Sequence, residues 1–273
     1  MRGISILVGV NAPATNHAPL TESETHAWKM AELAHQAGYR DIHVLLGTEA
    51  TREAVRGKIA AATRSLRWGD TLLVAYSGHG SITPDLDGDE ADGYDETWCL
   101  TDGDLLDDEL AACWRLAPAG ARIVLVSESC FGGGMARGGG PPAPDGGDAP
   151  GGDPVVWRGV QPFARSASCI TRAPAHDDGI AASVLVLASA AEGRHALRGI
   201  YIPSLLEVWR GGTFRGSYCD LHRQVRDLVR AQAPRYNPQI LMVGAPDLPF
   251  PLETAFHLDE EDRPVMRDGS YRR

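Results

Sequence analysis

The chain has 273 residues, of which 43% are hydrophobic and 23% are charged, so it is long enough for one large α/β domain or two small ones. Its formal net charge is −10 and no stretch forms a basic stripe, which disfavours nucleic acid as a partner. No apolar run has the length of a membrane span, and no signal-peptide pattern begins the chain. The five cysteines are scattered through the sequence, which indicates free thiols. We therefore expect a cytoplasmic protein with no membrane partner and no disulfide framework.

Strands and helices alternate through the first part of the sequence. Buried strands are predicted at residues 4–10, 41–46 and 71–76, because each is a short apolar run. Between them lie two stretches with apolar residues at helical spacing, for which Thr21 and Thr51 are the expected caps. This alternation of strands and helices predicts an α/β fold with a mostly parallel, doubly wound central sheet and helices on both faces.

Strands and helices continue to alternate in the second part of the sequence, where one long stretch without periodicity interrupts them. The further predicted elements are strands at 97–100, 123–126, 182–187 and 239–243, and helices at 105–110, 200–209 and 218–229. Residues 132–157 are mostly Gly, Pro, Ala and Asp without periodicity, which indicates a flexible linker or surface loop. Because the block after this linker is too short for a sheet of its own, we expect one continuous sheet.

Two predicted strands end in residues that can carry out chemistry. The strand at 71–76 is followed by Ser-Gly-His79-Gly, and the strand at 123–126 is followed by Ser-Glu-Ser-Cys130-Phe-Gly-Gly. Open α/β sheets place their reactive groups at the carboxyl ends of strands, so adjacent strands would bring the imidazole of His79 to the thiol of Cys130. An imidazole beside a cysteine raises the thiolate fraction and can later protonate a leaving amine.

The glycines beside these two residues would let a substrate carbonyl approach the backbone. The N–H groups of Gly80 and Cys130 are therefore candidates for an oxyanion hole. Taken singly, Cys130 and His79 are well explained as a small buried cysteine and an ordinary loop histidine. Their shared position at glycine-flanked strand exits favours a catalytic dyad.

Four motifs occur together in the chain, and a weaker one follows them. They are Tyr76-Ser-Gly-His-Gly80, the acidic stretch 88–96, Asp107-Asp-Glu-Leu110 and Glu128-Ser-Cys130, followed by Leu187-Ala-Ser-Ala-Ala-Glu192. In combination they resemble peptidase family C14, the caspase-like peptidases, and are most similar to metacaspases and the prokaryotic orthocaspases. The separation of 51 residues between His79 and Cys130 is also similar to the caspase spacing.

The resemblance implies a caspase-like (caspase-hemoglobinase) sandwich and a cysteine endopeptidase with a Cys130/His79 dyad that cuts after Arg or Lys. It implies one caspase-like domain over 1–273, with protein or peptide substrates, no cofactor needed for the chemistry, and a monomeric state. A protein activator or inhibitor is a further expected partner. The expected parts are a large-subunit-like part at 1–131, the linker at 132–157, a small-subunit-like part at 158–258 and a charged tail at 259–273.

The residues expected to bind substrate depart from the family pattern. Glu128 stands two residues before the cysteine, where family members generally carry an aspartate that lines a pocket for a basic side chain. It keeps the negative charge but is one methylene longer, so the pocket floor would shift. Ser77 matches another pocket position, while His26 takes the place of a second pocket aspartate and would weaken or alter basic specificity. The alternative for Glu128 is a solvated loop acid.

Four acids resemble the positions that bind activating calcium in metacaspases, namely Asp89, Asp92, Asp107 and Asp108. Clustered carboxylates with interspersed glycines suit a cation that prefers oxygen ligands, although the spacing does not fit an EF-hand. The family's further aspartate would fall near Arg137, where the chain has no acid. A solvated acidic loop explains the segment equally well.

The linker contains or adjoins two basic residues, Arg137 and Arg158, where the family is often cut between its halves. Self-cleavage is expected there if the pocket accepts arginine; otherwise the linker is a loop tolerated at the surface. The competing function is a catalytically inactive caspase-fold module that regulates or binds, against which the presence of Cys130 and His79 argues. A nucleotide-binding domain is discounted, because no Gly-x-Gly-x-x-Gly turn follows the first strand.

Overall fold

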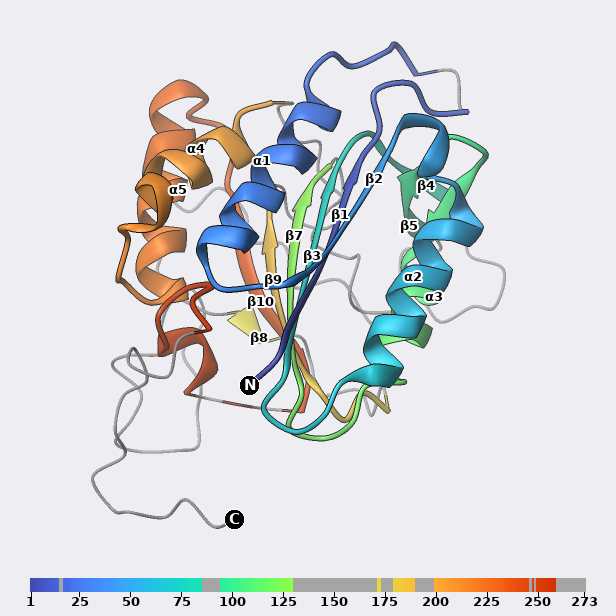
Figure 1. The fold of residues 1–273 in the computed structure, drawn as a ribbon. Coiled ribbons are helices and arrows are strands. Elements are labelled where there is room, and N and C mark those ends of the chain that lie inside the picture. Colours follow the sequence, from blue (N-terminus) through green and yellow to red (C-terminus); the bar gives the residue numbers. More distant parts are fainter. Residues whose placement is uncertain are drawn as a thin grey trace, which may run out of the picture.

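A seven-stranded sheet forms the centre of the molecule (Figure 1). The computed structural model describes residues 1–14, 17–84, 94–129, 171–172, 179–189, 199–245, 247 and 249–258. The strand order is β2-β1-β3-β7-β9-β10-β8; the neighbours from β2 to β9 are parallel and β10 is antiparallel to β9. The strands are β1 (Gly3–Gly9), β2 (Asp41–Leu46), β3 (Thr71–Ser77), β7 (Arg122–Glu128), β8 (Thr171–Arg172), β9 (Ser183–Ala188) and β10 (Gln239–Gly244).

Helices cover both faces of this sheet, as Figure 1 shows. On one face lie α1 (Ser23–Gln36), α4 (Tyr201–Trp209) and α5 (Tyr218–Gln232), and on the other lie α2 (Arg52–Ser65) and α3 (Asp107–Trp114). Successive strand residues point to opposite faces, so in β1 Ile6 packs with α2 and α3 whereas Leu7 packs with α1, α4 and α5. Burial on both faces explains why the central strands are unbroken apolar runs.

The predicted α/β class, the mostly parallel sheet and its continuity are confirmed. Strand β7 pairs with β9 from Arg122↔Ser183 to Ser127↔Ala188, so strands from before and after the glycine-rich stretch join in one sheet. Thr51 caps α2 as predicted, because its side chain accepts a hydrogen bond from the amide of Ala54 at 3.2 Å.

The amino end of α1 differs from the prediction. Its N-cap is Glu22 rather than Thr21, and the Glu22 side chain makes no capping hydrogen bond. Instead, the side-chain oxygen of Asn11 accepts hydrogen bonds from the amides of Ser23 and Glu24, at 3.0 and 3.4 Å. A residue twelve positions before the first residue of the helix thus satisfies the first-turn amides, which a local capping rule does not reveal.

A small antiparallel sheet follows β3 and is mostly absent from the prediction. It consists of β4 (Gly80–Pro84), β5 (Tyr94–Cys99) and β6 (Asp104–Leu106). Only β5 overlaps a predicted strand; no element is predicted at β4, and β6 overlaps the start of the helix predicted at 105–110. These short strands lack an apolar run of their own, so pairing with β5 rather than local sequence stabilises them.

The cysteines are not all free thiols. Cys99 and Cys113 are buried and free, as expected. Cys219 on α5 is disulfide-bonded, so the expectation of a free thiol is wrong at that position. Separately, none of the helices in the described residues is both long and apolar enough to cross a bilayer.

Candidate active site

The carboxyl ends of β3 and β7 lie side by side and lead to the two residues of the predicted dyad. The strands are parallel neighbours whose pairing ends with Ser77 opposite Glu128. His79 follows the first strand and Ser129 the second, and each is only 2% exposed. Cys130 comes next and lies outside the described residues. The adjacency of the two strand exits is confirmed, while the geometry of the thiol stays a prediction.

The imidazole of His79 is held on two sides by the loop before α1. Its Nε2 lies 2.8 Å from the carbonyl oxygen of Ala18. Because a carbonyl only accepts hydrogen bonds, Nε2 carries a proton and, in the neutral ring, Nδ1 is the nitrogen that can accept one. The ring also stacks on His17, with centroids 4.5 Å apart and planes at 14°. Sequence reasoning missed both partners, since every residue has a carbonyl and His17 lies in a predicted loop.

Tyr76 and Gly78 shape the turn that carries His79. The Tyr76 hydroxyl donates to the carbonyl oxygen of His79 at 2.7 Å and lies 3.0 Å from that of Cys99. A Cβ atom on Gly78 would stand 2.3 Å from this hydroxyl oxygen, so a side chain there would push the phenol away. Packing therefore explains the glycine in the motif Tyr-Ser-Gly-His: the phenol passes close to Gly78 to reach the carbonyl of His79, and a side chain at Gly78 would block it.

A chain of hydrogen bonds fixes the residue that precedes Cys130. The hydroxyls of Ser127 and Ser129 lie 2.9 Å apart, and the indole N–H of Trp98 donates to Ser127 at 3.2 Å. The hydroxyl of Ser189, just after β9, donates to the carbonyl oxygen of Ser129 at 3.0 Å. The small sheet and β9 together hold the backbone that leads into Cys130, and only the tertiary structure brings these groups together.

A cavity of about 270 Å³ opens beside His79 and Ser129. The three predicted substrate-binding residues, His26, Ser77 and Glu128, all line it. So does Glu22, which the sequence analysis did not single out. Among the described lining residues there is no Lys or Arg, so the described part of the wall carries two carboxylates and no permanent positive charge.

Glu128 is buried in the wall of this cavity, with only 3% of its surface exposed. Its Oε1 accepts hydrogen bonds from the backbone amides of Tyr201 and Ile202 at the amino end of α4, at 2.7 and 3.3 Å. Its Oε2 lies 2.9 Å from Nδ1 of His26 and 3.5 Å from the hydroxyl of Ser77. Burial, and then the charge of Glu128, raise the pKa of Tyr201. The alternative of a solvated loop acid is therefore wrong for Glu128.

The predicted calcium ligands are described only in part. Asp107 and Asp108 begin α3; Asp107 is buried and Asp108 half-buried, so neither sits in a fully solvated loop. Asp89 and Asp92 lie outside the described residues. Within the described part of the chain, no three or more His, Cys, Asp or Glu side chains form a group that could hold a metal ion.

The structure tests neither the oxyanion-hole role predicted for Gly80 nor the predicted self-cleavage sites. Gly80 begins β4 directly after His79 and pairs with Trp98 of β5, and its part in an oxyanion hole stays a prediction. The two self-cleavage candidates, Arg137 and Arg158, lie outside the described residues.

The overall architecture agrees with comparisons to known proteins. A family model, the caspase domain of peptidase family C14, matches residues 2–244. The chain belongs to this caspase-domain family. Its solved relatives include a Geobacter sulfurreducens protein, with a TM-score of 0.69 and 28% identity, in an alignment that covers 95% of this chain and 100% of that one. Caspase-1 of Spodoptera frugiperda has a TM-score of 0.55 at 15% identity, covering 89% of this chain and 86% of that one, a likeness that concerns the fold alone.

Curated relatives of this caspase-domain chain include metacaspases. It is 33% identical over 145 residues to metacaspase-1 of Schizosaccharomyces pombe, and 32% identical over 143 residues to metacaspase-7 of Arabidopsis thaliana. Each alignment covers 48% of this chain, but only 34% and 35% of the respective relatives. The chain thus spans about a third of the length of these relatives, and the expected resemblance to the caspase-like family and its fold is confirmed.

Proposed function

We propose that this caspase-domain protein is a cysteine endopeptidase in which Cys130 is the nucleophile and His79 the general base. The observation that carries the proposal is the position of His79 and Ser129 after two paired strands, on the wall of one cavity. Cys130 follows Ser129 directly in the sequence. A thiol and an imidazole at a concave site are the groups that acyl transfer requires.

In the proposed reaction, Nδ1 of His79 takes the proton of the Cys130 thiol and the thiolate attacks the carbonyl carbon of a peptide bond. The backbone N–H groups of Gly80 and Cys130 are candidates to stabilise the negative oxygen. The C–N bond then breaks, and His79 gives its proton to the leaving amine. Water hydrolyses the resulting thioester with His79 again as base. The carbonyl of Ala18 holds Nε2–H throughout, which keeps the ring in position.

Labelling with a peptidyl acyloxymethyl ketone tests the nucleophile. We expect one adduct, on Cys130, that disappears in Cys130→Ala and forms at least roughly a hundredfold more slowly in His79→Ala. Cys99 and Cys113 are internal controls, because both are buried and burial raises the pKa of Cys113 to about 11. Failure to label Cys130 in folded protein would contradict the proposal and favour a non-catalytic regulatory or binding module.

The residue accepted before the cleaved bond is proposed to be Arg or Lys. Two carboxylates, Glu22 and Glu128, line the cavity, and none of the described lining residues is Lys or Arg. A negative wall favours a positive side chain. Peptides that differ only in Arg, Lys or Asp at this position provide the comparison, and preferred cleavage after Asp would contradict this part of the proposal.

Calcium is proposed to bind the acidic segment through Asp89, Asp92, Asp107 and Asp108. Support comes from the donor chemistry, since carboxylate oxygens are the ligands that calcium prefers, and from the buried position of Asp107. Bound calcium would neutralise the repulsion among these acids. Calorimetric titration of Cys130→Ala with calcium measures binding without reference to activity; Asp107→Asn should weaken it, and an absence of binding heat would exclude the site.

Self-processing at Arg137 or Arg158 follows from the proposed arginine specificity. Prolonged incubation of wild-type protein beside Cys130→Ala, with mass spectrometry of the fragments, would reveal cuts that need the nucleophile. A chain that stays intact while it cleaves arginine peptides would count against self-processing. A protein activator or inhibitor is a further proposed partner.

A further inference from the structure

The carboxylate of Glu128 has little capacity left for a substrate cation. A carboxylate offers about four acceptor positions. Here Oε1 receives the amides of Tyr201 and Ile202, while Oε2 receives Nδ1 of His26 at 2.9 Å and the hydroxyl of Ser77 at 3.5 Å. A guanidinium that paired with Glu128 would have to displace these donors and leave buried groups unsatisfied, which is costly.

His26 links Glu128 to a second carboxylate. Nδ1 of His26 faces Glu128, and because a carboxylate only accepts hydrogen bonds, this nitrogen carries the proton. The other ring nitrogen, Nε2, lies 3.6 Å from Oε2 of Glu22. The ring therefore stands between two carboxylates, of which Glu128 is buried and Glu22 is exposed. A cation with N–H groups can donate to the exposed one.

Glu22 is accessible to a ligand, unlike Glu128. Its side chain is 67% exposed, whereas those of His26 and Glu128 are each 3% exposed. Its Oε2 reaches toward Gly199, since a Cβ atom on that glycine would lie 3.9 Å from it. Glu22 therefore presents its charge from the start of α1 toward the segment before α4, on the wall of the same cavity.

We propose that the carboxylate of Glu22 forms the contact for a basic residue of the substrate, and that Glu128 is a positioning residue. Glu128 holds the His26 ring and the amino end of α4. The meaning of this contact for cleavage rests on the proposed peptidase function. A planar guanidinium can donate to both oxygens of a carboxylate at once, whereas an ammonium is a single point of charge. The ligand class is therefore a peptide with Arg, and more weakly Lys, at the residue that enters the cavity.

Binding to the Cys130→Ala protein tests the contact without turnover. Fluorescent peptides carrying Arg, Lys or citrulline at the tested position are compared, because citrulline has the shape of arginine without its charge. We expect Glu22→Gln to weaken arginine-peptide binding by roughly tenfold or more, and to change citrulline-peptide binding less than about twofold. Glu24→Gln is the matched control: it removes the same charge from the same turn of α1, and Glu24 does not line the cavity.

Glu128→Gln distinguishes positioning from contact. A positioning residue should lower binding of arginine and citrulline peptides by similar factors and lower the melting temperature, because α4 loses a charged acceptor at its amino end. A selective loss of arginine binding in Glu128→Gln, with none in Glu22→Gln, would overturn the proposal. Equal arginine-to-citrulline ratios in the Glu22→Gln and Glu24→Gln proteins would overturn it as well.

Turnover of the same peptides by protein with Cys130 intact separates this inference from the proposed function. Arginine binding that depends on Glu22, together with no cleavage or labelling, would refute the peptidase and support the contact. Cleavage that is equally fast in wild-type and Glu22→Gln proteins would support the peptidase and refute the contact. Absence of both arginine-selective binding and cleavage would refute both.

Discussion

The hydroxyl of Tyr76 connects the core of the molecule to the candidate base. The side chain is fully buried, its ring stacks on Trp98 at 4.5 Å between centroids, and its oxygen bonds the carbonyl of His79 at 2.7 Å. The same oxygen lies 3.0 Å from the carbonyl of Cys99, so it also links the turn to β5. Removal of one oxygen atom would thus loosen two backbone segments next to the cavity.

Tyr76→Phe should lower the free energy of unfolding by about 1–2 kcal/mol, because buried carbonyl groups lose a donor. Tyr39→Phe is the matched control: the Tyr39 hydroxyl is buried without a hydrogen-bond partner among the described residues, so its loss should be neutral or stabilising. Urea denaturation of both variants measures the difference, and peptide turnover should fall only in Tyr76→Phe. Equal destabilisation of the two variants would contradict this role of the hydroxyl.

His222 on α5 should make stability depend on pH. Burial, and then the charges of Arg226 and Arg230, lower its pKa from 6.5 to about 3. Between these values the unfolded chain binds more protons than the folded chain. The stability contributed by neutral His222 is therefore complete above pH 6.5 and is lost as the pH falls toward 3, by about 1.4 kcal/mol per pH unit.

Denaturation at several pH values between 4.5 and 7.5 tests the role of His222. His222→Leu should reduce the slope of stability against pH, whereas His35→Gln, at an exposed position of α1, should keep the wild-type slope. An unchanged slope in His222→Leu would show that other groups cause the acid sensitivity.

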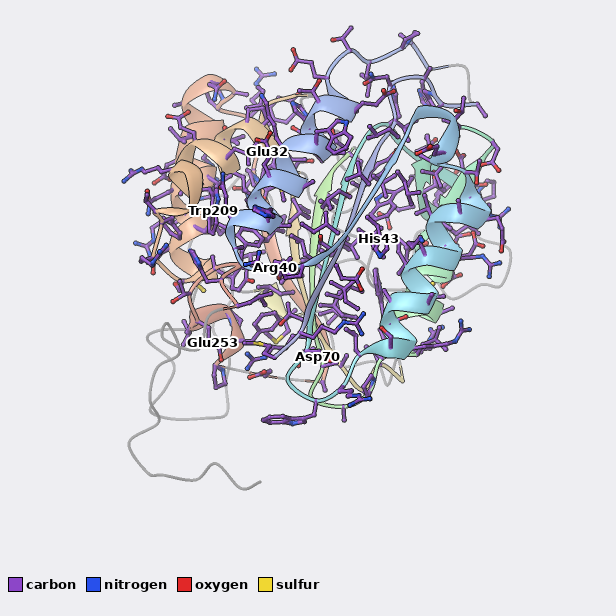
Figure 2. The ribbon with its side chains drawn as sticks, viewed as in Figure 1. Glu32, Arg40, His43, Asp70, Trp209 and Glu253 are labelled. Carbon is purple, nitrogen blue, oxygen red and sulfur yellow. The ribbon has the colours of Figure 1, made fainter. Side chains whose placement is uncertain are left out.

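Strand β7 is attached at both ends to elements that follow it far along the chain. At its carboxyl end Glu128 accepts the first amides of α4. At its amino end the guanidinium of Arg122 pairs with both oxygens of Glu253, at 2.6 and 3.0 Å, and with Asp247 at 2.9 Å. Figure 2 shows Glu253, like Asp70, at the end of the sheet where β3 begins. The cavity lies at the opposite end, where β3 leads to His79. The strand that leads to Cys130 is thereby held at both ends.

Arg122→Lys should lower the free energy of unfolding by about 1–3 kcal/mol, because lysine cannot make the two-oxygen contact with Glu253 and leaves partly buried acceptors without donors. Arg223→Lys is the control: Arg223 pairs with Asp220 on the exposed surface of α5, and a loss below about 0.5 kcal/mol is expected there. Urea denaturation provides the measurement, and similar losses in the two variants would contradict the importance of the partly buried cluster of Arg122, Asp247 and Glu253.

At the scale of the whole molecule, the sheet ends on one side in a strand of only two residues, β8. Strand β8 pairs with β10, with Leu241 opposite Thr171 and Met242 opposite Arg172. A very short edge strand offers few open backbone groups for pairing with a second copy. The resemblance to metacaspases also favoured a monomer.

We therefore expect a single species of monomer mass in light scattering coupled to size-exclusion chromatography. The mass should stay constant across a roughly hundredfold range of protein concentration, because dimerisation would follow mass action. A mass that doubles with concentration would contradict the monomer, and a substitution of residues 171–172 by proline would then test whether dimers form through the edge of β10.

Local pattern in the sequence was sufficient for the main strands, for most helices and for the two strand exits. Short apolar runs are buried on both faces wherever they fall in a parallel sheet, and Thr51 caps α2 through a contact three residues away. The motifs around His79 and Glu128 carried the caspase-like resemblance, which the family match over residues 2–244 confirms. What the sequence determined by itself is thus set by neighbours within a few residues, or by hydrophobic burial alone.

Only the tertiary structure decided how the site is arranged. Sequence identified Glu128 as an acid two residues before Cys130, but its pairing with His26 and with the amino end of α4 joins segments about a hundred and about seventy residues away. The Ala18 carbonyl that orients His79 carries no sequence signal at all, and the exposed Glu22 gains significance only because α1 places it beside the cavity. Hydrogen bonds between distant segments depend on the packing of the whole sheet and its helices, which no local pattern records.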